Sequence, residues 1–124
     1  MNALATQRLR DALAAAEAAT QFMGTTSLDG YKADFGLRLQ IERLLEIVGE
    51  SLSQARRLDP EADLNKHIPE LGSIVGMRNR IIHGYDRVDD EMVWSVVSHN
   101  VLLLREQIRN LLDQPDDEAG AVPG

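Results

Sequence analysis

The sequence predicts an all-α protein, folded as an antiparallel four-helix bundle. Four long stretches repeat their apolar residues at helical spacing, and no segment alternates apolar and polar residues as a half-buried strand does. Short connections between the stretches place consecutive helices side by side and antiparallel. The residues taken to divide the stretches are Gly24, Gly30, Pro60, Pro69, Gly72 and Gly84.

The first two expected helices are long and amphipathic. The first covers residues 3–23 and is rich in alanine, with Leu9, Leu13 and Ala16 on one side. The second runs from about Asp34 to Leu58. Its apolar stripe contains Leu37, Ile41, Leu44, Leu45, Val48 and Leu52.

The third helix is expected to begin near Pro69 and to end at His83. Proline suits the first turn of a helix, and Gly84 can take the left-handed conformation that closes one. The fourth helix opens after Val88, with Asp89 or Asp90 as its N-cap. Its apolar repeat contains Val93, Val97, Val101, Leu104, Ile108 and Leu111.

Length and composition limit the class of protein. The 124 residues suffice for one domain, expected over residues 1–114, with a flexible, disordered acidic tail at 115–124. Twenty acidic against 13 basic residues give a charge of −7, which argues against a DNA-binding protein but not against a small basic pocket. The chain has no cysteine, which excludes disulfides, cysteine-bound metals and thiol nucleophiles. Neither a membrane span nor a signal-like segment is evident, so we expect a cytoplasmic protein.

Arg78 interrupts the apolar pattern of the third helix. In a helical projection at about 100° per residue, Arg78 lies at the centre of an apolar arc. The arc extends roughly 60° to either side of it. The apolar members of this arc are Leu71, Ile74, Val75, Ile81 and Ile82. An arginine there costs free energy unless its charge is paired or faces a polar cavity. Besides a functional role, two structural explanations remain: a side chain that reaches water, or an ion pair with a glutamate of the second helix.

His83 and Tyr85 follow Arg78 at a spacing that carries information. Arg–x4–His alone is a weak pattern, but one of only two tyrosines two places after the histidine makes a chance occurrence rare. In one ideal helix Arg78 and His83 would point about 140° apart. They converge if the helix ends at His83, or if two copies of the third helix face each other in a dimer formed through the apolar stripe.

This motif resembles that of HEPN-domain ribonucleases, and within them the HepT toxins of HepT–MntA toxin–antitoxin systems. The Arg/His core is shared by HEPN ribonucleases, whereas the added tyrosine is specific to the HepT group. The resemblance extends over residues 3–113. It includes Asn79, the IVGES segment at 47–51 and the run from Tyr85 to Trp94.

The resemblance implies a homodimer in which Arg78 and His83 of both subunits line a cleft and cleave RNA. It also implies that no metal or other cofactor takes part and that the ribose 2′-hydroxyl is the nucleophile. His83 can exchange a proton near neutral pH, and Arg78 can hold the scissile phosphate. Asn79 would orient the phosphate or the histidine. Arg80 and Arg87 are nearby cations that would steer RNA toward an otherwise acidic molecule.

A partner is implied as well, a small MntA-like nucleotidyltransferase antitoxin that attaches AMP to the motif tyrosine. In this sequence the acceptor is Tyr85. Phosphates added two residues from His83 would compete with RNA for Arg78 and block the cleft. The structural alternative is a tyrosine that packs the end of the third helix onto the fourth.

Other candidate residues have plainer explanations. Glu50 is a supporting candidate, as the partner of Arg78 or of an arginine on the antitoxin. Because it lies nearly opposite Val48, a solvated or second-interface glutamate is an equally good explanation. His67 and His99 lie sixteen residues on either side of His83 without acids in a metal-ligand pattern, so we expect no metal site. We interpret His67 as a loop or helix-start residue and His99 as a packing residue. The single tryptophan, Trp94, is assigned to the core.

Two other functions compete with the ribonuclease toxin. One is a non-catalytic helical nucleotide-binding or adaptor partner of a nucleotidyltransferase, in which Arg78 and His83 bind a nucleotide phosphate without cleavage. The other is a dimerisation module in which Arg78 is a buried ion-pair residue. The complete Arg–x4–His–x–Tyr motif favours the ribonuclease, because a scaffold has no need of it.

Overall fold

The computed structural model describes residues 1–83 and 88–114, apart from the side chains of Ile82 and His83. Within these ranges every regular element is helical, so the all-α prediction is confirmed. Four long helical segments form the frame. They are α1 (Ala3–Met23), α3 (Phe35–Leu58), α5 (Leu71–His83), and a fourth segment made of α6 (Asp90–Ser95), the π-helical η2 (Val96–Asn100) and α7 (Val101–Asp113).

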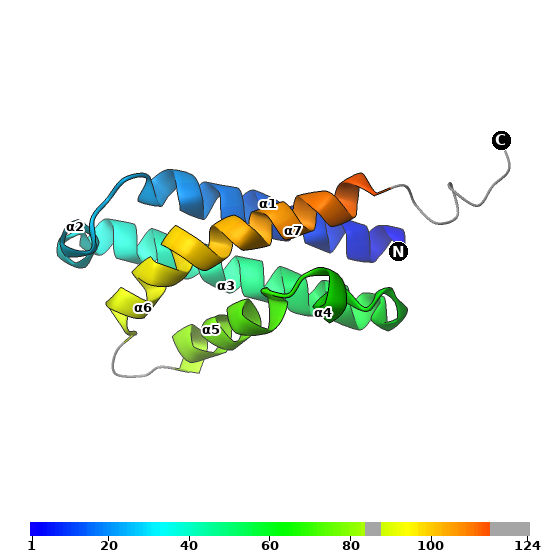
Figure 1. Ribbon diagram of the computed structural model, residues 1–124. Helices are drawn as coiled ribbons and strands as arrows, with labels where there is room; N and C mark the ends of the chain where they lie inside the picture. The colour runs from blue at the N-terminus through cyan, green and yellow to red at the C-terminus, as the bar shows by residue number, and fades with distance from the viewer. Residues whose placement is uncertain (84–87, 115–124) are drawn as a thin grey trace, which may run out of the picture.

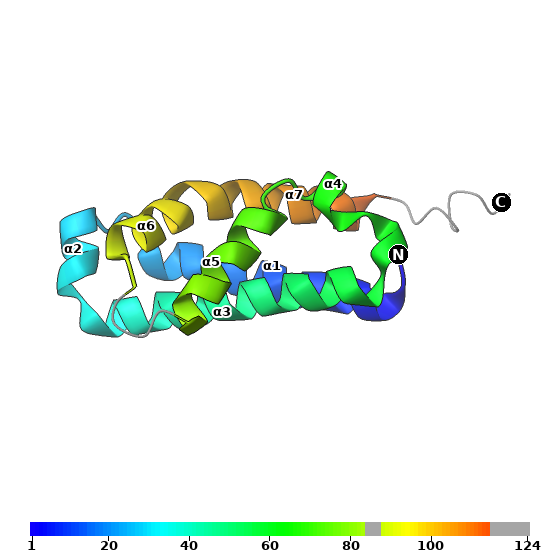
Figure 2. The same ribbon diagram turned by 90° about the horizontal axis from the view of Figure 1, so that it is seen from below.

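The long segments alternate in direction, as in an antiparallel bundle (Figure 1). Helices α1 and α3 pack along most of their length, and α7 packs against α1. Helix α5 packs on α3 and crosses it obliquely, which is clearest from below (Figure 2). Helix α3 therefore contacts both α1 and α5, and Arg78 lies on α5.

Side-chain caps fix the starts of the long segments near the predicted positions. Asn2 Oδ1 accepts a hydrogen bond from the N–H of Ala5 at 2.8 Å, and Asp34 Oδ1 accepts one from Leu37 at 3.0 Å. Of the two candidates for the last cap, Asp89 is the one used. Each cap satisfies an N–H that has no partner within its own helix.

The apolar stripes meet in one core, which includes the stripe of α5. Leu71, Ile74, Val75 and Ile81 are all buried within the protomer. This corrects the expectation that a dimer forms through this stripe, because the stripe already contacts α3 of its own chain. A second copy would have to use another face of α5.

A short helix, α2 (Leu28–Ala33), connects α1 to α3 where a glycine-marked turn was expected. Ser27 caps it by accepting from the N–H of Gly30 at 3.1 Å. Tyr31 anchors it, because its ring is completely buried in the core. Gly30 therefore lies inside a helix. The low helix propensity of this glycine is outweighed by the burial of Tyr31.

The connection from α3 to α5 also contains helical turns that were not expected, η1 (Pro60–Ala62) and α4 (Leu64–His67). Helix α5 then begins at Leu71, so Pro69 precedes the helix and Gly72 lies within it. Asp63 takes a left-handed conformation, with φ of 51°, between the two turns. The buried Leu64 and Ile68 fix this connection to the core.

The start of α6 is tied to α3 by an ion pair. Arg38 Nη1 lies 3.2 Å from Asp90 Oδ2, and the guanidinium lies over the ring of Phe35. Burial, followed by the neighbouring Asp90, raises the pKa of Glu42. Burial also raises the pKa of the Tyr31 phenol well above its usual range. This cluster holds the beginning of the fourth segment, which follows residues 84–87.

No helix in the described part of the chain is both long and apolar enough to cross a membrane. The expected acidic tail, residues 115–124, lies outside the described residues.

Candidate functional site around Arg78 and Glu50

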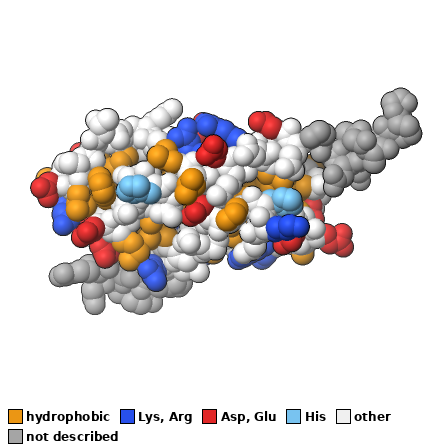
Figure 3. All heavy atoms as spheres, in the orientation of Figure 1, with side chains coloured by type: hydrophobic (Ala, Val, Ile, Leu, Met, Phe, Trp, Pro, Cys, Tyr) orange, Lys and Arg blue, Asp and Glu red, His pale blue; other side chains and the backbone are white. Residues whose placement is uncertain are grey.

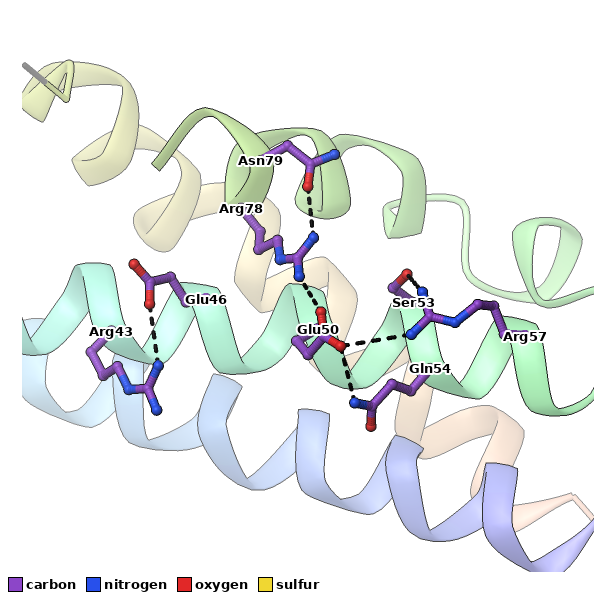
Figure 4. A network of polar contacts seen from close by, with 8 residues as sticks. All are labelled: Arg43, Glu46, Glu50, Ser53, Gln54, Arg57, Arg78 and Asn79. Carbon is purple, nitrogen blue, oxygen red and sulfur yellow. Dashed lines mark hydrogen bonds and ion pairs between the residues drawn. The ribbon is translucent and has the colours of Figure 1, made fainter. Parts of the chain in front are cut away.

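Arg78 projects from α5 toward α3 and pairs with Glu50 (Figure 4). Its Nη2 donates to Glu50 Oε2, and its Nη1 donates to Oδ1 of the adjacent Asn79 at 2.7 Å. The Arg78 side chain is 23% exposed, so it is neither fully buried nor free in solvent. The arginine in the apolar stripe thus has its counter-charge within the protomer, on the second long helix.

Glu50 is the centre of a small polar network on α3. Its Oε1 accepts from Nε2 of Gln54 at 3.0 Å and lies 3.7 Å from Nη2 of Arg57. Arg57 in turn donates to Ser53 Oγ at 3.0 Å. Of the roles considered for Glu50, the partner of Arg78 is the one that the structure shows. The carboxylate is also 38% exposed, so it is partly solvated while it pairs with Arg78.

Gly49 permits this approach of α3 and α5. A Cβ at position 49 would lie 2.7 Å from Cγ of Arg78 and still closer to its Cβ, which no real pair of side chains tolerates. Gly49 belongs to the IVGES segment that resembles the family, where the sequence alone assigns it no role. A glycine inside a long helix costs about 1 kcal/mol relative to alanine, and that cost was a signal that something packs against it.

Arg78 retains hydrogen-bonding capacity in this arrangement. A guanidinium has five N–H donors, and the two described contacts engage one on each terminal nitrogen. Nε of Arg78 is buried and has no partner among the described residues. The guanidinium is therefore oriented by a carboxylate and an amide while part of its fork remains able to bind an oxyanion.

The other motif residues are only partly within the described structure. His83 is the last residue of α5, about 7.5 Å along the helix axis from Arg78, and its side chain lies outside the described residues. Tyr85 and Arg87 lie outside them entirely. Arg80 is exposed on α5, and its Nη1 contacts Sδ of Met92 at 3.2 Å. Helix α5 thus brings Arg78, Asn79 and Arg80 to the end that leads into the segment with Tyr85.

The remaining candidates lie apart from Arg78. His67 is exposed and is the last residue of the short helix α4. It was expected in a loop or at the start of a helix. His99 is exposed in η2, where its Nδ1 lies 3.0 Å from the carbonyl oxygen of Ser95 and its ring meets the edge of Trp94. Trp94 packs against the core and donates from Nε1 to the carbonyl of Thr26 at 2.9 Å.

The charge around the site is mixed rather than basic. On the face drawn in Figure 3 acidic and basic side chains are interspersed. Glu50 has two arginines beside it, Arg57 and Arg78. Within the described ranges no three potential metal-ligating side chains gather together. The arrangement is suited to holding an oxyanion on arginine rather than to attracting a duplex over a broad surface.

Comparison with known families agrees with the motif. A family model described as Ribonuclease HepT-like matches residues 12–111, which extend from α1 into α7 and contain the whole network. Searches of curated proteins and of solved structures gave no match.

Proposed function

The chain belongs to the HepT-like ribonuclease family, and on this premise we propose that it is a metal-independent endoribonuclease, the toxin of a toxin–antitoxin pair. The observation that carries the proposal is the family match, which covers Arg78, His83 and Tyr85 together. The Glu50–Arg78 pair supports it, because it orients a guanidinium at the place where the family motif requires one.

The proposed reaction is transesterification at an RNA phosphodiester. The 2′-hydroxyl attacks the adjacent phosphorus, the bond to the 5′-oxygen breaks, and the products are a 2′,3′-cyclic phosphate and a 5′-hydroxyl. His83 accepts the proton of the 2′-hydroxyl or donates one to the leaving oxygen. Arg78 binds the non-bridging oxygens, whose negative charge increases in the transition state. Asn79 holds the Arg78 fork in place.

A homodimer would supply the second set of these residues. The exposed face of α5 is the surface we assign to it, because this face is made of small residues and is hollow. Gly72 and Gly76 lie one turn apart, and a Cβ on either would meet no atom within 4 Å. They line a groove of about 380 Å³ between α5 and the fourth segment. A second α5 can approach closely there, while Arg78 points to the other side of α5, toward Glu50 of its own chain.

Neutralisation is proposed to act at Tyr85 through a nucleotidyltransferase that transfers AMP to its hydroxyl. The phenol oxygen would attack the α-phosphorus of ATP, and pyrophosphate would leave. The added phosphate would then lie near Arg78 and exclude RNA from it. Arg80 and Arg87 are proposed to steer RNA toward the same end of α5.

The test is cleavage of RNA by the purified protein in EDTA, beside Arg78→Ala and His83→Ala. We expect cleavage with cyclic phosphate ends by the wild type and a loss of about a hundredfold or more in either variant. His67→Ala is the matched control, since His67 is exposed on α4 and should be dispensable.

Two results would contradict the proposal. Full activity of His83→Ala would show that the assigned mechanism is wrong. An inert wild type, with a mass that excludes AMP on Tyr85, would favour the adaptor function, in which Arg78 binds a nucleotide phosphate without cleavage.

A further inference from the structure

A second feature of the molecule lies beside the Arg78 network and shares two residues with it, Gln54 and Arg57. An open groove of about 430 Å³ runs between the beginning of α1 and the end of α3. Its lining residues are Leu4, Arg8, Gln54, Arg57 and Leu58. The two helices are antiparallel, so the beginning of α1 and the end of α3 meet at one end of the bundle (Figure 1).

Hydrogen bonds fix the walls of this groove. The backbone N–H of Asn2 donates to Asp59 Oδ2 at 2.8 Å, and its side-chain amide donates to the carbonyl of Leu58 at 2.9 Å. The N-cap of α1 is thereby joined to the last residues of α3. The groove is a preformed feature, so a ligand would lose little free energy in ordering its walls.

The lining combines aliphatic and cationic side chains. Leu4 is 66% exposed and Leu58 is 42% exposed, so the walls present aliphatic side chains to solvent. Two guanidinium groups lie beside them, on Arg8 and Arg57. Aliphatic walls together with cations match a nucleotide, whose base has flat faces that pack on apolar side chains and whose phosphate is anionic.

The groove is continuous with the Arg78 network. Gln54 lines the groove and also donates to Glu50, the partner of Arg78. Arg57 lines the groove and lies 3.7 Å from the same carboxylate (Figure 4). Residues 50 and 57 are about two helical turns apart, roughly 10 Å along α3. A chain bound at Arg78 can therefore extend into the groove within a short span.

We propose that this groove is an RNA subsite, which binds a single-stranded nucleotide next to the one held at Arg78. Arg57 binds the phosphate, with Arg8 on the opposite wall, and the base lies against Leu4 and Leu58. The proposal rests on the proposed ribonuclease function.

The present partners of the two arginines are weakly held. The separation of Arg57 and Glu50 is long, and the Arg8–Asp11 pair, at 3.1 Å, has both side chains 38% exposed. Exposed pairs of this kind contribute little to stability, so a phosphate can replace the carboxylates at small cost. An acidic protein segment would also satisfy the arginines. The size of the groove and its continuity with a phosphate-binding arginine favour RNA.

The test compares short and long oligoribonucleotides as substrates of Arg57→Gln and Leu4→Ser. Both side chains are largely exposed, so the fold should tolerate the changes. We expect the wild type to gain in kcat/KM as nucleotides are added on one side of the cleaved bond. Leu4→Ser should lose about fivefold on the long substrate and little on the shortest one, and Arg57→Gln should lose about fivefold more on the long substrate than on the shortest one.

Arg43→Gln is the matched control. Arg43 is on the same helix, pairs with Glu46, and has a side chain 70% exposed against 65% for Arg57. It should behave as the wild type on every substrate. A length-dependent loss in Arg43→Gln as well would overturn the proposal, because it would indicate a general charge effect.

A binding measurement separates failure of this proposal from failure of the ribonuclease function. A 2′-O-methyl oligoribonucleotide cannot be cleaved, and its affinity is measured as a function of salt. Arg57→Gln should lower the slope of log K against log salt by about 0.7, whether or not the protein cleaves RNA. An unchanged slope together with normal cleavage would overturn the subsite alone. Displacement of the oligonucleotide by polyglutamate at equal charge would assign the groove to an acidic protein partner instead.

Discussion

Gly49 lies directly against the side chain of Arg78. The Cβ that residue 49 lacks would fall 2.7 Å from Arg78 Cγ, so the absence of a side chain on α3 determines where the guanidinium on α5 can lie. Glu50, the next residue, then receives that guanidinium. The steric gap and the charge partner are thus adjacent in sequence, and both serve one arginine.

Gly49→Ala is expected to disturb the site, because it adds a methyl group where Arg78 already lies. The added methyl must push α5 away or turn Arg78 out of the contact, at a cost of about 1–3 kcal/mol in the free energy of unfolding. Part of that cost is offset by the better helix propensity of alanine. Cleavage should fall at least about tenfold, because Arg78 leaves its partner.

The control for this change is Gly36→Ala on the same helix. A Cβ there would have Asp34 Oδ1 as its nearest neighbour, at an ordinary 3.7 Å. Stability should be equal to or above that of the wild type by up to about 1 kcal/mol. Urea denaturation of both variants measures the difference, and equal stabilities would show that the close approach does not constrain α5.

Glu50→Gln separates an orienting role for the carboxylate from an inhibitory one. If Glu50 aims the guanidinium, kcat should fall about tenfold, while the free energy of unfolding changes by no more than about 1 kcal/mol, since the carboxylate is 38% exposed. Glu46→Gln removes a similarly placed carboxylate that pairs with Arg43, and should leave kcat unchanged. A rise in kcat for Glu50→Gln would mean that the carboxylate competes with the RNA phosphate.

The long helices could be predicted because local signals and packing agree in them. The first predicted range, 3–23, is the observed α1. Asp34, at which the second helix was predicted to begin, and Asp89, one of the two cap candidates for the fourth, are N-caps in the structure. Where a tertiary contact determines the local structure, the prediction from the sequence was wrong. Gly30 indicates a turn by itself, but the burial of Tyr31 places it in a helix.

The π-helical turn in the fourth segment has a similar cause. Val93, Val97 and Val101 are all buried, although steps of four residues drift by about 40° each in an α-helix. The wider turn of η2 keeps the three valines on one face. The four-residue spacing of the valines was visible in the sequence. Only the packing of the fourth segment on α1 shows that all three valines must stay on one face.

For the site, the residue types could be predicted and their pairing could not. Arg78 was identified from its place in the apolar stripe, whereas Glu50 was left with several alternatives. The side of α3 that faces α5 depends on the angle at which the helices cross, and Gly49 controls that approach. The sequence also suggested a dimer through the α5 stripe, because a helical projection cannot distinguish a core surface from an interface.

Gly76→Leu tests the dimer proposed on the exposed face of α5. Among the described residues no atom beyond the adjacent backbone of α5 itself lies within 4 Å of the new Cβ, and leucine is the better helix former by about 1 kcal/mol. The protomer should therefore become more stable, while sedimentation shows monomers and cleavage falls with the loss of the shared cleft. Ala14→Leu, at an exposed position of α1, should leave the dimer intact. A monomeric wild type would contradict the proposed assembly.

Tyr85→Phe tests the acceptor of AMP. After incubation with ATP and the partner nucleotidyltransferase, the wild type should gain the mass of one or more AMP units and lose RNA cleavage, while the variant gains nothing and stays active. His83→Ala keeps the tyrosine and should still be modified, which separates the acceptor from catalysis. AMP found on the Tyr85→Phe chain would place the acceptor at another residue.

Glu42→Gln is expected to stabilise the fold in a pH-dependent manner. Burial and the adjacent Asp90 raise the pKa of Glu42 in the folded state, so the native protein favours its protonated carboxyl. That contribution to stability is fully present below the unfolded pKa of about 4.3 and is lost as pH rises through the folded value.

At neutral pH the wild type therefore bears a penalty that glutamine removes, and the gain should stay below about 1 kcal/mol because the group is partly solvated. Thermal unfolding should show a higher Tm for the variant at neutral pH and no difference near pH 4. The exposed Glu61→Gln should show no such trend, and a gap that is the same at every pH would mean that shape, rather than charge, produces it.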